Sequence, residues 1–287
     1  MKNGFLIFLA SFVVLGGSWC GFVLAPVVQL GGEKQTAILN SSDLYPVGRP
    51  GMANQGLQVY RANGCAACHT EQIQQSGVAC DVVLTGDETN QHEAVRVITN
   101  EIEEYHLQLN SYIGPPGLPY TILSGVNKSV ADIVSEKIST AKGKVEIHIK
   151  AIGPDIDRGW GRRRSVAEDY LYDDPIQLGN VRIGPDLADV GARLPDANWQ
   201  LLHLYAPQSV VKASAMPPFR YLFQVRKIGR EPSPDALNLP KEFAPPAGYE
   251  VVPTAKTQEL VAYLLSLHAD VPLHDAPFTR PVAASKP

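Results

Sequence analysis

Two cysteines and a histidine lie within five residues of one another, at Cys65, Cys68 and His69. Cysteines separated by two residues can form thioethers to both vinyl groups of one porphyrin, and the histidine that follows is then held beneath the iron as an axial ligand. A zinc site would need a second pair of soft ligands, whereas Cys20 and Cys80 are isolated. A thioredoxin-like motif would follow a strand, whereas a helix is expected here. This CxxCH motif therefore predicts one covalently attached haem c.

The second ligand of such an iron must come from a short set, because the chain has three methionines and seven histidines. Met216 stands directly before two prolines, which force extended backbone and keep its side chain out of a helix. Met1 and Met52 are poorly placed, one at the terminus and one just ahead of the motif's own helix. We expect Met216 to bind the iron, with His203 as the competitor. Ligation by His and Met favours electron transfer over oxygen chemistry, because it raises the iron potential and leaves no open site.

The composition is that of a globular protein with one apolar anchor, since 45% of the residues are hydrophobic and 19% are charged. Its 287 residues are enough for one good-sized core or two small ones. The 23 prolines and 24 glycines indicate long ordered loops, which suit a domain whose haem replaces much of the side-chain core. A formal net charge of −4 gives no basis for a nucleic-acid partner.

Residues 4–30 contain no charged side chain. At about 1.5 Å rise per residue, a helix of this length exceeds the hydrocarbon thickness of about 30 Å. A cleaved signal peptide is the rival interpretation, but the Val-Leu-Ala site at residues 23–25 is followed by Pro26, which disfavours cleavage. Lys2 precedes the span, so the positive-inside rule favours a cytoplasmic N-terminus. We expect a single-pass protein of the bacterial inner membrane with its haem domain on the periplasmic side.

Four parts are expected along the chain: a transmembrane anchor at 1–32, a linker at 33–50, a cytochrome c domain at 51–270 interrupted by an insertion at 79–154, and a flexible tail at 271–287. Within the domain, residues 54–63 are expected to form a short helix that Gly64 ends. Residues 254–268 are expected to form a second helix with Thr254 as its N-cap. A helix-like run at residues 198–205 lies between them.

The insertion is expected to be a small α/β segment. Its sequence predicts a helix at 88–109, a Gly-Pro-Pro-Gly loop at 114–117, a helix at 130–141 and a strand at 144–150. It contains no second CxxCH motif. Cys80 has no evident disulfide partner, because Cys20 belongs to the membrane span, so it is either a buried thiol or an intermolecular link. A docking surface for a partner subunit and a passive elaboration both stay open as roles for the insertion.

Arg162, Arg163 and Arg164 form a basic cluster beside Trp160. Most runs of this kind are solvated faces. The alternatives are that one guanidinium neutralises a haem propionate, since its planar fork suits a carboxylate, or that the cluster contacts an acidic electron donor.

Several blocks agree in order and spacing with a known family. They are Arg158-Gly159-Trp160-Gly161 and residues 172–179, 184–191 and 207–217. Together with the apolar N-terminal helix and the CxxCH motif, these blocks resemble the mono-haem subunit of cbb3-type cytochrome c oxidases, the FixO or CcoO family. The resemblance implies that Cys65 and Cys68 hold the haem and that His69 and Met216 bind its iron. It also implies that the Pro185 carbonyl accepts a hydrogen bond from the free nitrogen of His69.

The resemblance further implies the fold, which would be mainly α. It would combine an N-terminal transmembrane helix with a class I cytochrome c-like haem domain that carries the inserted small α/β segment. In small c-type cytochromes the helix before the haem motif crosses the final helix. Gly56 and Tyr60 would then lie against Tyr263.

By the same resemblance, the chain is expected to relay electrons and to perform no bond chemistry itself. The electrons would come from a soluble cytochrome c or another c-type cytochrome subunit, and would pass to a catalytic haem-copper oxidase subunit that reduces O2 to water. A cytochrome subunit of nitric oxide reductase or a free-standing membrane-tethered electron carrier is the alternative. A third hypothesis is a gas sensor whose Met216 leaves the iron.

Overall fold

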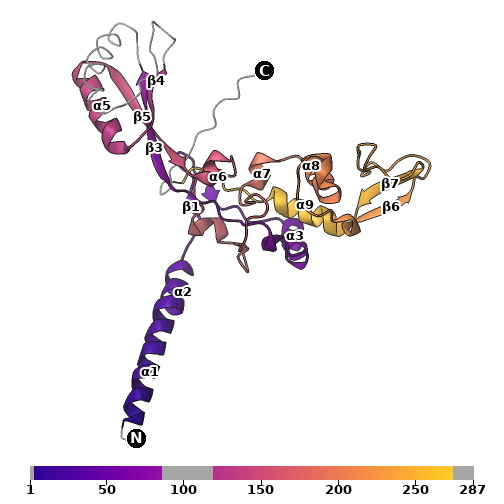
Figure 1. Ribbon diagram of the computed structural model, residues 1–287, viewed down its shortest axis with the longest axis horizontal. Helices are drawn as coiled ribbons and strands as arrows, with labels where there is room; N and C mark the ends of the chain where they lie inside the picture. The colour runs from indigo at the N-terminus through magenta and orange to yellow at the C-terminus, as the bar shows by residue number, and fades with distance from the viewer. Residues whose placement is uncertain (1–2, 86–118, 274–287) are drawn as a thin grey trace. The chain divides into compact units, whose positions relative to one another are not determined.

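The computed structural model describes residues 3–85 and 119–273, and the chain divides into two compact units (Figure 1). The first unit consists of residues 1–48 and 166–176, and the second of residues 49–165 and 177–287. The second unit contains the CxxCH motif and two separate hydrophobic clusters, one of them within the insertion.

The first unit begins with one continuous helix. It runs through α1 (Gly4–Trp19), a π-helical turn η1 (Cys20–Leu24) and α2 (Ala25–Leu30), and none of its residues is buried. The helix has 27 residues, and an 18-residue stretch of it has a mean hydropathy of 2.1. At about 1.5 Å per residue it is about 40 Å long, which exceeds a hydrocarbon layer of about 30 Å. The predicted span is therefore confirmed as a helix that is long and apolar enough to cross a membrane.

A short hairpin and a 3-10 turn complete the first unit. β1 (Thr36–Ala37) pairs antiparallel with β2 (Leu44–Tyr45), so the segment expected to be a linker forms a short hairpin. The Tyr45 hydroxyl donates a hydrogen bond of 2.7 Å to Asp169 Oδ1, which belongs to η5 (Ala167–Tyr170). This bond joins two parts of the unit that lie far apart in the sequence.

Most of the regular elements of the second unit outside the insertion are helices. In chain order its elements are α3 (Gly51–Ala62), η2 (Cys65–Ala67), α6 (Pro154–Asp157), α7 (Val190–Arg193), α8 (Ala197–Tyr205), η6 (Pro207–Ser209), η7 (Arg220–Leu222), β6 (Phe223–Lys227), β7 (Tyr249–Pro253) and α9 (Ala255–Leu265). β6 and β7 form an antiparallel hairpin. The three predicted helices thus correspond to α3, α8 and α9. Thr254 accepts a hydrogen bond from the Thr257 N–H, as expected of an N-cap.

The helices α3 and α9 cross at a glycine. A Cβ added to Gly56 would collide with the Glu259 carbonyl oxygen, so only glycine permits this approach. Beside it, the ring of Tyr60 packs on the ring of Tyr263, with centroids 5.1 Å apart and an interplanar angle of 56°. The helix crossing that the resemblance implied is confirmed, and Tyr60 and Tyr263 belong to the larger hydrophobic cluster.

The described part of the insertion, residues 79–85 and 119–154, contains a three-stranded antiparallel sheet and one helix. The strand order is β4 (Tyr120–Val126), β3 (Gly77–Thr85) and β5 (Lys144–Ile152), and α5 (Lys128–Thr140) shares a core with the sheet. Cys80 of β3 is fully buried in that core and forms no disulfide. Of the two roles considered for Cys80, the structure shows the buried thiol.

The sequence predicted the later half of the insertion but missed its central strand. The helix at 130–141 and the strand at 144–150 are confirmed by α5 and β5, whereas the predicted features at 88–109 and 114–117 lie outside the described residues. β3 and β4 were not predicted, although β3 is a nearly continuous apolar run of the kind found in central strands. With the β6–β7 hairpin, these strands make the described fold a mixture of helix and sheet, so a mainly α fold is not confirmed.

Candidate functional site

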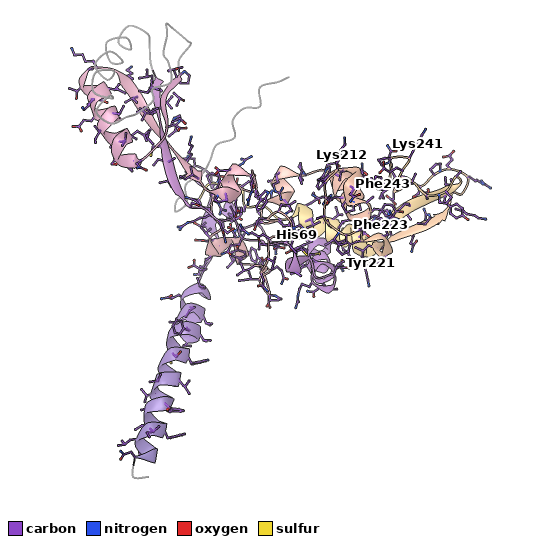
Figure 2. The ribbon with its side chains drawn as sticks, in the orientation of Figure 1. His69, Lys212, Tyr221, Phe223, Lys241 and Phe243 are labelled. Atoms are coloured by element: carbon purple, nitrogen blue, oxygen red, sulfur yellow. The ribbon has the colours of Figure 1, made fainter. Side chains whose placement is uncertain are left out.

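An apolar cavity in the second unit brings together four of the five predicted site residues. Its void measures about 550 Å³ including the space at its mouth, and its lining includes Cys65, His69, Pro185 and Met216. Apolar side chains of α7, α8 and α9 supply much of the remaining wall. Figure 2 shows the side chains of the unit, with His69 labelled. Cofactor sites are typically apolar concavities with a few polar side chains, and this lining has that character.

The CxxCH motif reaches the cavity through a tight turn at the end of α3. Gly64 has a φ of +67°, in the left-handed region that glycine adopts at little cost, and the chain then enters η2. The His69 N–H donates to the Cys65 carbonyl at 3.0 Å, which folds the histidine back beside the first cysteine. Cys68 lies on the same turn, outside the cavity lining. The turn is the local structure that the sequence predicted for these residues.

Neither cysteine of the motif forms a disulfide. Burial is the main reason that the pKa of Cys65 is raised to about 12, so this sulfur is protonated at neutral pH. Across residues 3–85 and 119–273, no three His, Cys, Asp or Glu side chains are grouped closely enough to hold a metal ion. That part of the chain therefore contains no set of side chains that could form a zinc site.

The His69 ring is fixed by the residues Gly184 and Pro185. Its Nδ1 lies 2.8 Å from the Pro185 carbonyl oxygen. Because a carbonyl only accepts, Nδ1 must carry the proton, and the lone pair of Nε2 is left available to a metal. A Cβ on Gly184 would collide with the imidazole ring, and the Gly184 N–H donates to the Cys68 carbonyl at 2.9 Å. Burial lowers the pKa of His69, which keeps the ring neutral.

Both candidates for the second ligand lie at the same cavity. Met216 is half-buried on the loop after η6 and packs against the larger hydrophobic cluster. His203 of α8 also lines the cavity, and its ring stacks on Trp199 with centroids 4.8 Å apart. Burial and the neighbouring His69 lower the pKa of His203. The structure thus brings a thioether and a second neutral imidazole within reach of one ligand.

Arg193 is a cavity residue that the sequence did not single out. It lines the cavity from the end of α7 and donates from Nη2 to the Asp186 carbonyl at 2.6 Å. Its Nε is buried and has no hydrogen-bond partner among the residues that the structure describes. An unpaired guanidinium N–H in an apolar wall is costly unless an acceptor from a bound group meets it. A ligand with a carboxylate would satisfy it.

The basic cluster Arg162, Arg163 and Arg164 lies outside the cavity lining. Arg163 is fully buried and donates to the Val271 carbonyl at 2.8 Å and to the Arg164 carbonyl at 3.0 Å. The expectation of a solvated face is therefore wrong for Arg163, because its guanidinium satisfies backbone carbonyls in the interior.

The chain resembles a known family over its C-terminal half. The family model of the cytochrome c oxidase mono-haem subunit, FixO, matches residues 136–268. No curated protein matches the chain. The matched region begins within α5 and ends beyond α9, so it contains Pro185 and Met216 but neither the CxxCH motif nor the N-terminal helix. The family is a mono-haem subunit of a cytochrome c oxidase, which implies a haem and a catalytic oxidase partner. Over residues 136–268, the chain is similar to the FixO family of mono-haem cytochrome c oxidase subunits.

Proposed function

We propose that Cys65 and Cys68 hold one haem c by thioether bonds, and that His69 and Met216 bind its iron. The observation that carries the proposal is the hydrogen bond from His69 Nδ1 to the Pro185 carbonyl, because it presents Nε2 as a metal ligand in a cavity that also contains Cys65 and Met216. A bound haem c supplies one-electron chemistry through its iron.

The chain's own residues would hold the group and tune it. The apolar lining excludes water from the iron, which favours simple electron transfer over chemistry at the metal. Pro185 fixes the tautomer and orientation of His69. Arg193, rather than Arg162, Arg163 or Arg164, would pair its buried Nε with a haem propionate.

The proposed fold is a class I cytochrome c-like domain over residues 51–270, interrupted by the insertion at 79–154. The crossing of α3 and α9 beside the CxxCH turn supports this proposal. Residues 1–32 would anchor the domain in the bacterial inner membrane, with residues 33–50 as a linker and the domain on the periplasmic side. The apolar helix at residues 4–30 supports the anchor.

In this arrangement the chain is an electron-relay subunit of a cbb3-type oxidase. An electron would pass from a soluble cytochrome c or another c-type cytochrome subunit to the haem held by His69. It would then pass to the catalytic haem-copper subunit, which reduces O2 to water. The similarity of residues 136–268 to the FixO family supports the oxidase partner.

Purification of the complex from native membranes, with subunit identification and a reduced-minus-oxidised spectrum, tests this function. We expect a c-type haem spectrum and a polytopic partner that contains copper. A polytopic partner with non-haem iron would favour the nitric oxide reductase alternative, and absence of a partner would favour a free-standing carrier. Binding of carbon monoxide to the reduced protein would favour the gas sensor, since an iron closed by His69 and Met216 should not bind it.

A further inference from the structure

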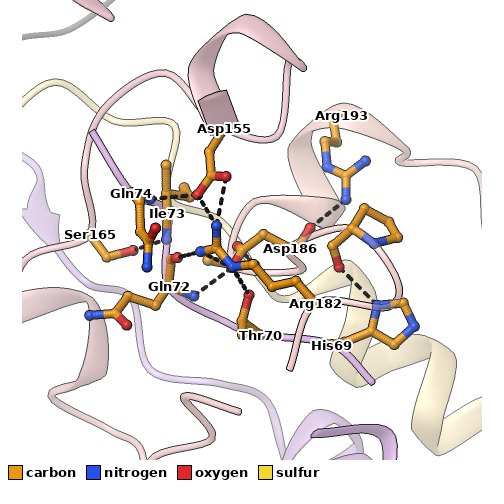
Figure 3. A network of polar contacts seen from close by, with 12 residues as sticks. His69, Thr70, Gln72, Ile73, Gln74, Asp155, Ser165, Arg182, Asp186 and Arg193 are labelled. Atoms are coloured by element: carbon orange, nitrogen blue, oxygen red, sulfur yellow. Dashed lines mark hydrogen bonds and ion pairs between the residues drawn. The ribbon is translucent and has the colours of Figure 1, made fainter. Parts of the chain in front are cut away.

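Arg182 joins segments of the second unit that lie far apart in the sequence (Figure 3). Its Nη1 donates to both carboxylate oxygens of Asp155 at 2.7 Å, and its Nε donates to the Thr70 hydroxyl at 3.0 Å. A fourth hydrogen bond runs from Nη2 to the Gln72 carbonyl. Asp155 is 1% exposed. Because the Asp155 carboxylate is shielded from water and Arg182 also donates to the loop after His69, the ion pair holds that loop in one geometry.

Asp186 belongs to the same network and follows the Gly184-Pro185 turn, whereas Arg182 precedes it. Asp186 is fully buried, and its Oδ2 accepts from the Thr70 hydroxyl at 2.6 Å. The carbonyl oxygen of Pro185, the residue before it, accepts a hydrogen bond of 2.8 Å from His69 Nδ1. Arg182 and Asp186 therefore flank the turn that orients the imidazole, and both are tied to the chain segment that follows that imidazole.

Asp155, in turn, lies at the base of the insertion. β3 begins and β5 ends at the paired residues Gly77 and Ile152, and the Ser76 N–H donates to the Ile152 carbonyl at 2.9 Å. Next along the chain, the Gln74 N–H donates to Asp155 Oδ2 at 2.7 Å. The ion pair between Asp155 and Arg182 therefore lies next to the point where the paired strands β3 and β5 leave the rest of the unit.

We propose that Asp155 and Arg182 are positioning residues for the axial histidine. They fix the Gly184–Pro185 turn and, through it, the orientation of the His69 ring and the strength of its Nδ1–H hydrogen bond. The inference rests on the proposed function, because ring orientation affects a redox potential only when His69 binds iron. A firm hydrogen bond at Nδ1 makes the imidazole a stronger donor and favours ferric iron. Loosening the ion pair should therefore raise the midpoint potential.

The test uses the full-length, haem-loaded chain with Asp155→Asn and Arg182→Gln. We expect both variants to shift the midpoint potential upward and to change the electron paramagnetic resonance g values of the ferric haem. Charge alone would give shifts of opposite sign, because one variant removes a negative charge and the other a positive one. Asp81→Asn is the matched control, since it removes an ion pair of 2.8 Å with Lys150 inside the insertion and should change neither readout.

Two conservative variants keep the test decisive if the first two fail to retain haem. Asp155→Glu and Arg182→Lys preserve both charges but alter the bidentate geometry, so each should shift the potential upward by less than the neutral variants. If the haem-loaded Asp155 and Arg182 variants have the same midpoint potential and g values as Asp81→Asn, the positioning role is overturned. The same holds if the midpoint potentials of the Asp155 and Arg182 variants shift in opposite directions. Either result would leave the proposed function intact. An unaltered chain without covalent haem would overturn both.

Discussion

The hydroxyl of Tyr263 on α9 donates to the carboxylate oxygens of Glu71 at 3.0 and 2.9 Å. Glu71 is 2% exposed and lies two residues after His69, and its backbone N–H donates to the Leu178 carbonyl at 3.1 Å. The final helix is thus joined by a buried polar contact to the loop that leaves the CxxCH motif. This contact connects the stability of the domain with the geometry of its candidate haem site.

Replacing Tyr263 with Phe should destabilise the protein by about 1–3 kcal/mol, because a buried carboxylate loses a donor while its desolvation remains. Urea unfolding of the haem-loaded chain measures this free energy. The control is Tyr249→Phe on β7, where the side chain is 38% exposed. Equal stability of the two variants would show that the contact with Glu71 contributes nothing.

Replacing Gly56 with Ala should also destabilise the protein, by about 1–3 kcal/mol, because the new methyl group collides with the Glu259 carbonyl at the helix crossing. Gly51→Ala in the same helix is the control, since no atom lies within 4 Å of the added Cβ there. That control should change the free energy of unfolding by about 0.5 kcal/mol or less. A Gly56→Ala variant as stable as the control would mean that α3 and α9 do not cross at this point.

Replacing Met216 with Ala should remove the sulfur-to-iron charge-transfer absorption of the oxidised protein and lower its midpoint potential, because a thioether ligand stabilises ferrous iron. His203→Ala should keep the absorption, since this ring stacks on Trp199 at the cavity wall. Optical spectra and redox titration of both variants decide the question. The reverse pattern would make His203 the ligand and Met216 an apolar wall residue.

Asp189 should make stability depend on pH. Burial raises the pKa of its carboxyl to about 6, above the unfolded value of about 4, and the carboxyl accepts the Ala269 N–H at 2.9 Å. The native state then binds more protons than the unfolded state between these values. This contribution to stability is therefore present in full below about pH 4 and is lost as the pH rises through about 6.

Asp189→Asn removes the titration. The free energy of unfolding of this variant should gain about 1–3 kcal/mol relative to the parent chain between pH 4 and pH 7. Denaturant unfolding at a series of pH values measures the difference, with the exposed Asp235→Asn as control. A constant difference across this range would mean that Asp189 has the same pKa in both states.

Local patterns in the sequence were enough to predict the elements that carry the haem motif. Gly64 indicated the end of α3 and Thr254 the start of α9. Both signals are local, because a left-handed turn and a side-chain cap each depend on a few adjacent residues. The contact between His69 and Pro185 spans 116 residues and came from the family resemblance. No periodicity in the sequence indicates it.

The strands β3 and β4 and the roles of Arg163, Arg182 and Arg193 could not be predicted from local patterns. β3 pairs with β4 across residues 86–118, so its partner is set by tertiary structure rather than by a local signal. Arg163 and Arg182 resemble surface residues in the sequence, and only the fold supplies the carbonyls and carboxylate that satisfy them. Arg193 was missed for the same reason, since its role depends on the cavity wall it joins.

The intact mass of the purified chain tests the central claim most directly. If Cys65 and Cys68 carry one haem c, the denatured polypeptide should exceed its amino-acid mass by one haem, and Cys65→Ser combined with Cys68→Ser should abolish the increment. The increment should survive treatment with acid and organic solvent, because thioethers are covalent. A chain that weighs no more than its amino acids after maturation in a host that attaches c-type haem would contradict the account.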